Sequence, residues 1–157
     1  MSSALKILPE FSLRPAGPGD DEFALGLYLP ITREFLCDIP GWDDARIIER
    51  FRKTYDPVQV QVICVNGTDV GWMQLSELDE GLHLDQLHLV EAYRGRGIGT
   101  RLMKDLQSQA QSRDLPFRLN VMRANSAIEF YRGLGFAVVG EDNEKYQMQW
   151  TRQKKDD

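Results

Sequence analysis

The sequence predicts a mixed α/β (α+β) fold, in which a largely antiparallel central sheet of about seven strands is flanked by helices. The apolar segments follow one another in the order strand, two helices, three strands, helix, strand, helix, two strands. Short turn signals separate the three consecutive strands, as in antiparallel hairpins. A helix connects the fourth strand to the fifth, which is the kind of connection that parallel neighbours require. We therefore expect these two strands to run parallel.

The composition is typical of one globular domain. The chain has 157 residues, of which 42% are hydrophobic and 27% charged, so we expect a single domain over residues 1–157. The formal net charge of -5 argues against a general nucleic-acid binder, because such proteins need a dominant basic surface.

The cysteines and the hydropathy pattern indicate in which cellular compartment the protein is expected. Cys37 and Cys64 are far apart and outside any C-x-x-C spacing, which predicts neither a disulfide framework nor a metal site. No run approaches the ~20 apolar residues of a membrane span, and residues 1–10 lack the apolar core of a signal peptide. We expect a cytoplasmic protein that does not bind membranes.

The predicted elements before residue 57 are a strand at 11–14 and helices at 23–29 and 45–55. Asp20 and Asp21 have the chemistry of N-caps for the first helix, which we expect Pro30 to end. Asp43 and Asp44 have the same position relative to the second helix.

Three predicted strands follow, at residues 58–64, 70–78 and 82–90. Asn66-Gly67 is a hairpin turn signal between the first two. In the third, the apolar alternation of Leu82 and Leu84 slips by one residue to Leu87 and Leu89. Such a slip indicates a β-bulge, because one extra residue returns the later side chains to the core face.

The remaining predicted elements are a helix at 97–113, a strand at 117–121, a helix at 126–134 and strands at 137–140 and 146–150. The long helix has one apolar stripe, which includes Ile98, Leu102 and Leu106, and Pro116 follows its end. Gly135 has the position of a C-cap for the shorter helix.

A glycine-rich segment before the long helix has the pattern of an anion site. It reads Tyr93-Arg94-Gly95-Arg96-Gly97-Ile98-Gly99-Thr100. Glycines let the backbone approach a ligand and leave amide N–H groups exposed, and the start of a helix favours phosphate. Arg94 and Arg96 add full positive charges, so in an acidic chain the segment predicts a local pyrophosphate site.

Other readings of this segment remain. A Walker A loop needs Gly-Lys followed by Ser or Thr, and the dinucleotide-binding pattern needs glycine where Thr100 stands, so both fit less well. A glycine-rich turn that only ends a strand is the structural alternative.

Two motifs resemble those of the GNAT superfamily of N-acetyltransferases. Residues 94–99 resemble its R-x-x-G-x-G/A signature for acetyl-CoA. Residues 125–136 resemble its second signature, an Asn followed by a helix with a Tyr and then Leu-Gly-Phe. The resemblance extends from about Leu82 to Trp150 and covers the first half only in element order.

The resemblance implies a fold, a co-substrate and a set of site residues. It implies an acceptor-binding half at about 11–80 and an acetyl-CoA-binding half at about 82–151. Backbone groups of Leu87, His88 and Leu89 would contact the pantetheine arm. The residues implied to hold the pyrophosphate are Arg94, Gly95, Arg96, Gly97, Ile98, Gly99 and Thr100. Asn125 would contact the cofactor, and Tyr131 would lie near the thioester sulfur.

Direct transfer of the acetyl group needs a base and benefits from a donor to the leaving thiolate. His83 shares a strand face with Asp85 and is our candidate base, although an exposed strand histidine can also be merely solvated. Tyr131 is the candidate hydrogen-bond donor to the leaving sulfur, and a packed aromatic is the alternative.

The acceptor is an amine on a small molecule or a peptide, and its identity stays open among polyamines, aminoglycosides, amino acids, peptide N-termini and protein lysines. Tyr28, Phe35, Trp42 and Tyr55 could line its groove, but core packing explains them equally well, and we assign none of them. A homodimer is an open alternative to a monomer. The rival functions are an idle acetyl-CoA-binding sensor and an interaction domain without a cofactor.

Overall fold

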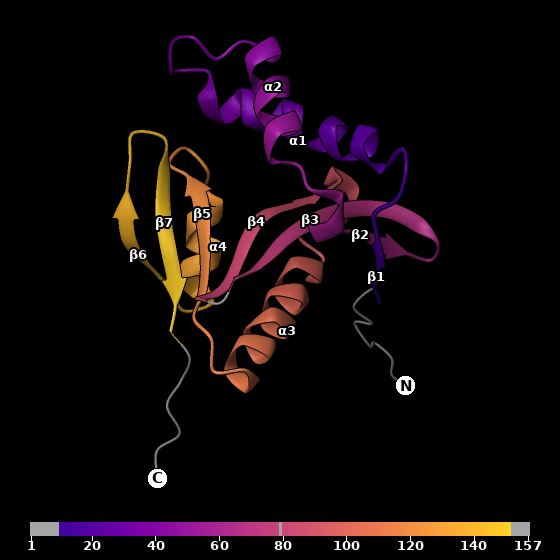
Figure 1. Ribbon diagram of the computed structural model, residues 1–157, viewed down its shortest axis with the longest axis vertical. Coiled ribbons are helices and arrows are strands. Elements are labelled where there is room, and N and C mark those ends of the chain that lie inside the picture. The colour runs from indigo at the N-terminus through magenta and orange to yellow at the C-terminus, as the bar shows by residue number, and fades with distance from the viewer. Residues whose placement is uncertain (1–9, 79, 152–157) are drawn as a thin grey trace.

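The computed structural model describes residues 10–78 and 80–151, which form one seven-stranded sheet in the order β1-β2-β3-β4-β5-β7-β6 (Figure 1). The strands are β1 (Ser12–Pro15), β2 (Val60–Val65), β3 (Thr68–Leu78), β4 (Gly81–Leu89), β5 (Phe117–Met122), β6 (Phe136–Glu141) and β7 (Lys145–Trp150). β4 and β5 pair parallel, and all other neighbours pair antiparallel. The predicted fold class is confirmed.

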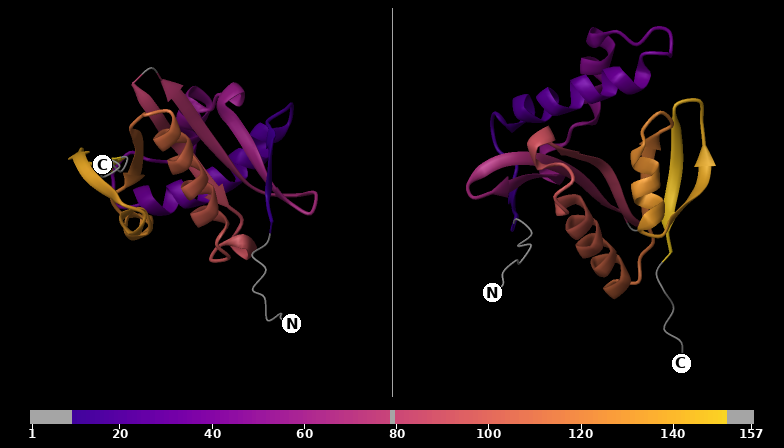
Figure 2. Two further views of the ribbon diagram at one scale, coloured as in Figure 1. Left: turned by 90° about the horizontal axis from the view of Figure 1, so that it is seen from below. Right: turned by 180° about the vertical axis from the view of Figure 1, so that it is seen from behind.

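The helices cover both faces of the sheet (Figures 1 and 2). They are α1 (Asp20–Leu36), α2 (Asp44–Thr54), α3 (Ile98–Ser112) and α4 (Ala127–Gly133), with short 3-10 turns η1 (Pro57–Gln59) and η2 (Glu91–Tyr93). One buried cluster, with Tyr28, Phe51 and Trp72, lies under α1 and α2. The larger cluster packs the apolar stripe of α3 against β2 to β7. The predicted long helix and its buried face are therefore confirmed.

Pro30 does not end α1, contrary to our prediction. The helix continues to Leu36 because Ala24, Tyr28, Thr32 and Leu36 recur every fourth residue and bury one continuous row. A proline inside a helix costs about 3 kcal/mol. Burial of Tyr28 before the proline and of Leu36 after it, at about 1.5 to 3 kcal/mol for each large side chain, offsets that cost.

The N-terminus of α1 also differs from the prediction. Its N-cap is Gly19, and no side chain caps it. The carboxylate of Asp20 instead accepts hydrogen bonds from both terminal nitrogens of Arg14 and from the backbone N–H of Gly17. The prediction for the second helix is correct, since Asp43 accepts from the backbone N–H of Arg46.

Val58 lies outside the strand in which we expected it. It belongs to η1, where Asp56 accepts a hydrogen bond from its backbone N–H, and it is 91% exposed. β2 begins at Val60 and is buried on both faces as an inner strand.

The predicted β-bulge lies in β4. Gln74 of β3 pairs with Gln86, whereas the next residue, Leu75, pairs with Leu84, so Asp85 is the extra residue. β4 and β5 pair only from Leu82 to Leu84, and beyond the bulge the two strands diverge (Figure 1).

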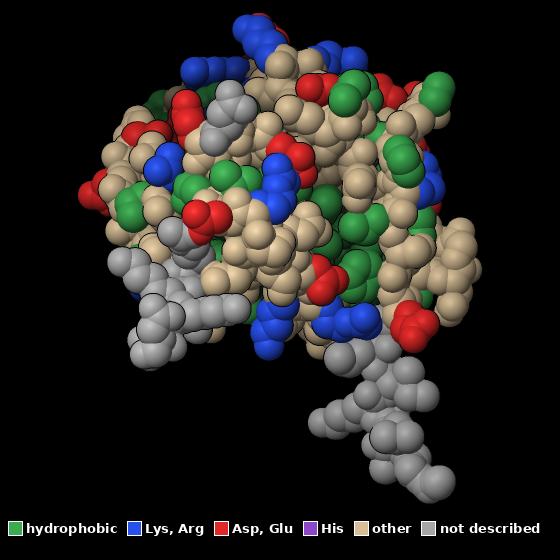
Figure 3. Space-filling view, turned by 60° about the horizontal axis from the view of Figure 1, so that its bottom comes forward, with side chains coloured by type: hydrophobic (Ala, Val, Ile, Leu, Met, Phe, Trp, Pro, Cys, Tyr) green, Lys and Arg blue, Asp and Glu red, His purple; other side chains and the backbone are tan. Residues whose placement is uncertain are grey.

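The described surface mixes charges of both signs. Figure 3 shows acidic and basic side chains interspersed over the face that it draws. None of the helices within residues 10–78 and 80–151 is both long and apolar enough to cross a membrane.

Candidate functional site

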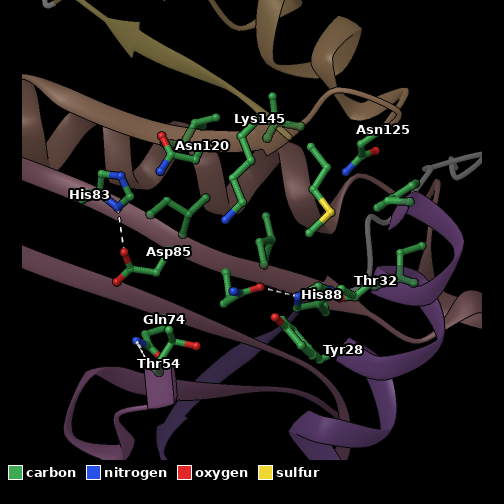
Figure 4. Close-up of a pocket in the computed structure, with 18 of the residues that line it drawn as sticks. Tyr28, Thr32, Thr54, Gln74, His83, Asp85, His88, Asn120, Asn125 and Lys145 are labelled. Atoms are coloured by element: carbon green, nitrogen blue, oxygen red, sulfur yellow. Dashed lines mark hydrogen bonds and ion pairs between the residues drawn. The ribbon is translucent and has the colours of Figure 1, made fainter. Parts of the chain in front are cut away.

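A cleft of about 440 Å³ opens where β4 and β5 diverge (Figure 4). Its walls come from α1, α2, β3, β4, β5, α4 and β7. Of the site residues predicted from the sequence, those that line it are His83, Leu87, His88, Asn125 and Tyr131. The divergence of the two strands thus brings residues from both halves of the chain to one cavity.

His83 and Asp85 form a contact on the cleft side of β4. Nδ1 of His83 lies 2.7 Å from Oδ1 of Asp85, and each side chain is about one quarter exposed, at 26% and 28%. The hydroxyl of Ser76 donates to the other carboxylate oxygen of Asp85. An ionised Asp85 fixes the proton of a neutral His83 on Nδ1, which leaves the lone pair on Nε2.

The side chain of His88 faces the cleft, although the resemblance implied a role chiefly for its backbone. Its Nε2 lies 2.7 Å from Oε1 of Gln86, and its ring stacks on Trp72 with 5.2 Å between the centroids. Tyr28 meets the same ring edge-on. Burial lowers the pKa of His88 to about 4, and the charge of Arg94 adds to this effect. His88 is therefore neutral at pH 7.

Tyr131 of α4 borders the cleft from the opposite side. Its ring packs against Phe130 and Phe136 at centroid distances of 5.2 and 6.0 Å. Burial raises the pKa of Tyr131 to about 12, so its phenol is neutral and can donate a hydrogen bond. Asn125, before the same helix, accepts a hydrogen bond at its Oδ1 from the backbone N–H of Ala127, which leaves its side-chain N–H₂ as a donor.

The glycine-rich loop leads directly into α3. Gly95 and Gly97 have φ angles of 73° and 86°, a region that favours glycine, and no side chain caps the start of the helix at Gly97. Ile98 is buried in the core and anchors the first turn. The unoccupied cap leaves the first N–H groups of α3 available to an anion.

The two arginines of the loop are exposed and make local contacts. Nε of Arg94 donates to the backbone oxygen of Leu89 over 2.9 Å, which leaves its terminal nitrogens available to a ligand. The guanidinium of Arg96 lies 5.0 Å from the ring centre of Tyr93. Both charges are therefore held near the start of α3.

The outer part of β4 has a free edge on the side of β5. The side chains of Leu87 and Leu89 pack on the core, whereas β4–β5 pairing stops at Leu84. Beyond that point, backbone groups of β4 on this edge have no strand partner among the described residues. Such an edge can bind an extended chain of alternating donors and acceptors.

The sequence analysis did not identify Lys145, and only some of its aromatic candidates for the acceptor groove line the cleft. Lys145 of β7 extends into the cleft (Figure 4). Its signal was the alternation of Lys145, Gln147 and Gln149 along one strand face, but its position across from Met122 needs the sheet register. Of the four aromatic candidates, Tyr28 and Phe35 line the cleft.

The other two aromatic candidates lie elsewhere. Trp42 lies under the guanidinium of Arg46, and Tyr55 stacks on Phe51 within the cluster beneath α1 and α2. Core packing explains both.

The comparisons with known proteins agree with this geometry. The family model of the acetyltransferase (GNAT) domain matches residues 47–156. The chain belongs to the GNAT family. A search of the curated proteins gave no match to this GNAT sequence.

Solved structures share the fold of this GNAT protein at low identity. The PaiA N-acetyltransferase of Thermoplasma acidophilum, determined with coenzyme A, has a TM-score of 0.71 and 19% identity over 90% of this chain and 99% of that chain. Ard1 of Thermoplasma volcanium has a TM-score of 0.61 and 21% identity over 92% of this chain and 99% of that chain. An N-acetyltransferase of Staphylococcus aureus Mu50 has a TM-score of 0.64 and 18% identity over 88% of this chain and 98% of that chain.

The described residues of this GNAT protein form no cluster of metal ligands. Within residues 10–78 and 80–151, no three His, Cys, Asp or Glu side chains are grouped so that they could hold a metal ion.

Proposed function

We propose that this protein is an N-acetyltransferase that moves the acetyl group of acetyl-CoA directly to an amine. The observation that carries the proposal is the cleft between the diverging strands β4 and β5, with Tyr131 on one wall and the His83–Asp85 pair on another. Membership of the GNAT family supports acetyl-CoA as the co-substrate.

The glycine-rich loop fits the pyrophosphate of acetyl-CoA. Positive φ angles at Gly95 and Gly97 are typical of a turn whose backbone N–H groups can bind an anion, and no side chain caps the start of α3. We assign the segment from Arg94 to Thr100, together with Arg94 and Arg96 as charged partners, to this group. The free edge of β4 at Leu87, His88 and Leu89 is assigned to the pantetheine arm.

Acetyl-CoA supplies an activated acyl group whose leaving group is a thiolate. His83 would take a proton from the acceptor ammonium at Nε2, so that the neutral amine attacks the thioester carbonyl carbon, while Asp85 holds the imidazole ring through Nδ1. Backbone N–H groups at the bulge would stabilise negative charge on the carbonyl oxygen. As the N–C bond forms and the C–S bond breaks, the positioning of both substrates in the cleft lowers the barrier.

Tyr131 would donate a hydrogen bond to the departing thiolate. With its pKa at about 12, complete proton transfer to a thiolate of pKa ~8.5 would be uphill by about 5 kcal/mol. A donated hydrogen bond carries no such cost. The side-chain N–H₂ of Asn125 is a further donor on the same wall.

A turnover screen tests the proposal. The purified protein is incubated with acetyl-CoA and a panel of amines, and release of the free thiol is followed. Turnover with any amine would support the proposed acetyltransferase activity. A thermal shift with acetyl-CoA but no thiol release from any amine would instead identify an idle binding protein, and no shift well above micromolar concentration would reject cofactor binding.

A further inference from the structure

Among the described residues that line the cleft, Lys145 is the charged side chain whose ammonium makes no hydrogen bond or ion pair. Its side chain reaches from β7 into the cavity opposite β4 (Figure 4). Within the described residues, no hydrogen bond or ion pair forms at Nζ. Burial and, after it, the charge of Arg50 lower the pKa of Lys145, against the smaller opposing effects of the carboxylates of Glu144, Asp142 and Asp85. A partly desolvated ammonium without a partner gains strongly from a bound anion.

The other charged groups that line the cleft are already paired. Nη1 of Arg50 lies 3.0 Å from Oε2 of Glu144, and both side chains are about three quarters buried, being 26% and 21% exposed. Asp85, the acidic residue of the lining, holds His83 and accepts from Ser76. Among the residues that the structure describes, the lining therefore has one carboxylate, engaged beside the candidate base, and an unpaired ammonium across from it.

This charge pattern discriminates between acceptor classes. A polyamine has two or more ammonium groups and needs a second carboxylate, which the described lining does not offer. An amine that also has a carboxylate matches both walls, because its ammonium faces Asp85 and its carboxylate faces Lys145. Asn120 of β5 also lines the cleft and offers an amide N–H₂ as a second donor.

We propose that Lys145 forms a carboxylate-binding subsite and that the acceptor is an amino acid or a similar small amine that has a carboxylate. The inference rests on the proposed acetyl transfer. It adds the chemical class of the acceptor, which neither the family nor the fold specifies.

The first arm of the test compares acids with their neutral amides. Amino acids with the amine at increasing distance from the carboxylate are each paired with the primary amide of the same length. Putrescine and spermidine represent polycations. We expect kcat/KM to favour the acid of at least one pair by about ten- to a hundred-fold, the effect of one charge-assisted hydrogen bond. Calorimetry in the presence of CoA should give the same preference in Kd without any turnover.

The second arm assigns the preference to Lys145. Lys145→Met should lower kcat/KM for the acid and leave that for the amide nearly unchanged, whereas Lys145→Arg should keep the preference. Lys104→Met, which removes an exposed lysine of α3 outside the cleft, is the matched control. Melting curves verify folding, and Lys145→Gln replaces Lys145→Met if that variant is unfolded.

The outcomes separate the two proposals. Thiol release from amines with equal use of acids and amides, or with a preference for spermidine, overturns the subsite and leaves the acetyltransferase. An equal loss for acid and amide in Lys145→Met also overturns it, because a general structural effect would then explain the variant. No thiol release from any amine rejects both proposals.

Discussion

The imidazole of His83 and the carboxylate of Asp85 are in contact at the bulge of β4, with 2.7 Å between Nδ1 and Oδ1. Residues two apart on a strand share a face, and Asp85 is the residue that has no partner on β3. The bulge thus places a positioned imidazole where β4 separates from β5.

Replacement of His83 tests its role as the base. His83→Ala should lower kcat by about a hundred- to ten-thousand-fold, the usual contribution of general base catalysis. Added imidazole should restore part of the activity, which a purely structural defect would not allow. Asp85→Asn, which keeps an acceptor for Nδ1, should cost less. Wild-type turnover of His83→Ala would remove this residue from the chemistry.

The partly buried imidazole of His88 predicts sensitivity of the fold to acid. Because its folded pKa is about 4 and its unfolded value about 6.5, the unfolded chain takes up the proton first as the pH falls. The free energy of unfolding should therefore decrease between about pH 6.5 and pH 4, by up to about 3 kcal/mol. Urea denaturation across this range measures it.

The variant that isolates this effect is His88→Gln, in which the decrease should be smaller. His83→Gln replaces the other histidine of the chain and should retain the contribution of His88. Equal pH dependence in His88→Gln and in the wild type would contradict burial of a neutral imidazole.

Much of the fold follows from local pattern. The order of the elements, the stripe of α3 and the phase slip at Leu84 to Leu87 all predicted what the structure has. Pro30 and Asp20 misled the prediction, because the buried row of α1 depends on packing against the rest of the fold and the carboxylate of Asp20 is held by Arg14 of the preceding strand. Local propensity cannot include such contacts.

The site was predictable only in part, for the same reason. Motifs identified the loop and Tyr131, and strand periodicity placed His83 beside Asp85. Lys145 belongs to no motif, and its entry into the cleft depends on the pairing of β7 with β5.

Gly97 tests the assignment of the anion site. Gly97→Val should abolish the thermal stabilisation by acetyl-CoA, because its φ of 86° disfavours a β-branched residue and the side chain would obstruct the approach of the pyrophosphate. Gly67→Val imposes similar strain at φ 79° in the β2–β3 turn, where nothing lies within 4 Å of an added Cβ. It should lower the melting temperature but keep the cofactor shift. A normal shift in Gly97→Val would show that the loop is misassigned.

Arg94 and Arg96 should affect binding more than chemistry. Phosphate contacts persist from the ground state to the transition state, so Arg94→Ala and Arg96→Ala should raise KM for acetyl-CoA with little change in kcat. Each loss is worth about 1.5 to 3 kcal/mol. Arg113→Ala, at the other end of α3 and paired with Glu77, is the control. If neither KM changes, neither arginine contacts the cofactor.

Tyr131 separates hydrogen bonding from packing at the leaving group. Tyr131→Phe keeps the ring that packs on Phe130 and Phe136, so the fold and the cofactor-induced thermal shift should survive. Because a phenol of pKa about 12 donates a hydrogen bond but does not give up its proton readily, kcat should fall by about ten- to a hundred-fold, the effect of one bond to a charged acceptor. Tyr146→Phe removes the hydroxyl of a tyrosine that does not line the cleft and should retain kcat. The comparison needs steady-state kinetics and a melting curve on the same preparation. Wild-type turnover of Tyr131→Phe would make Tyr131 a packing residue, and water would then have to stabilise the thiolate.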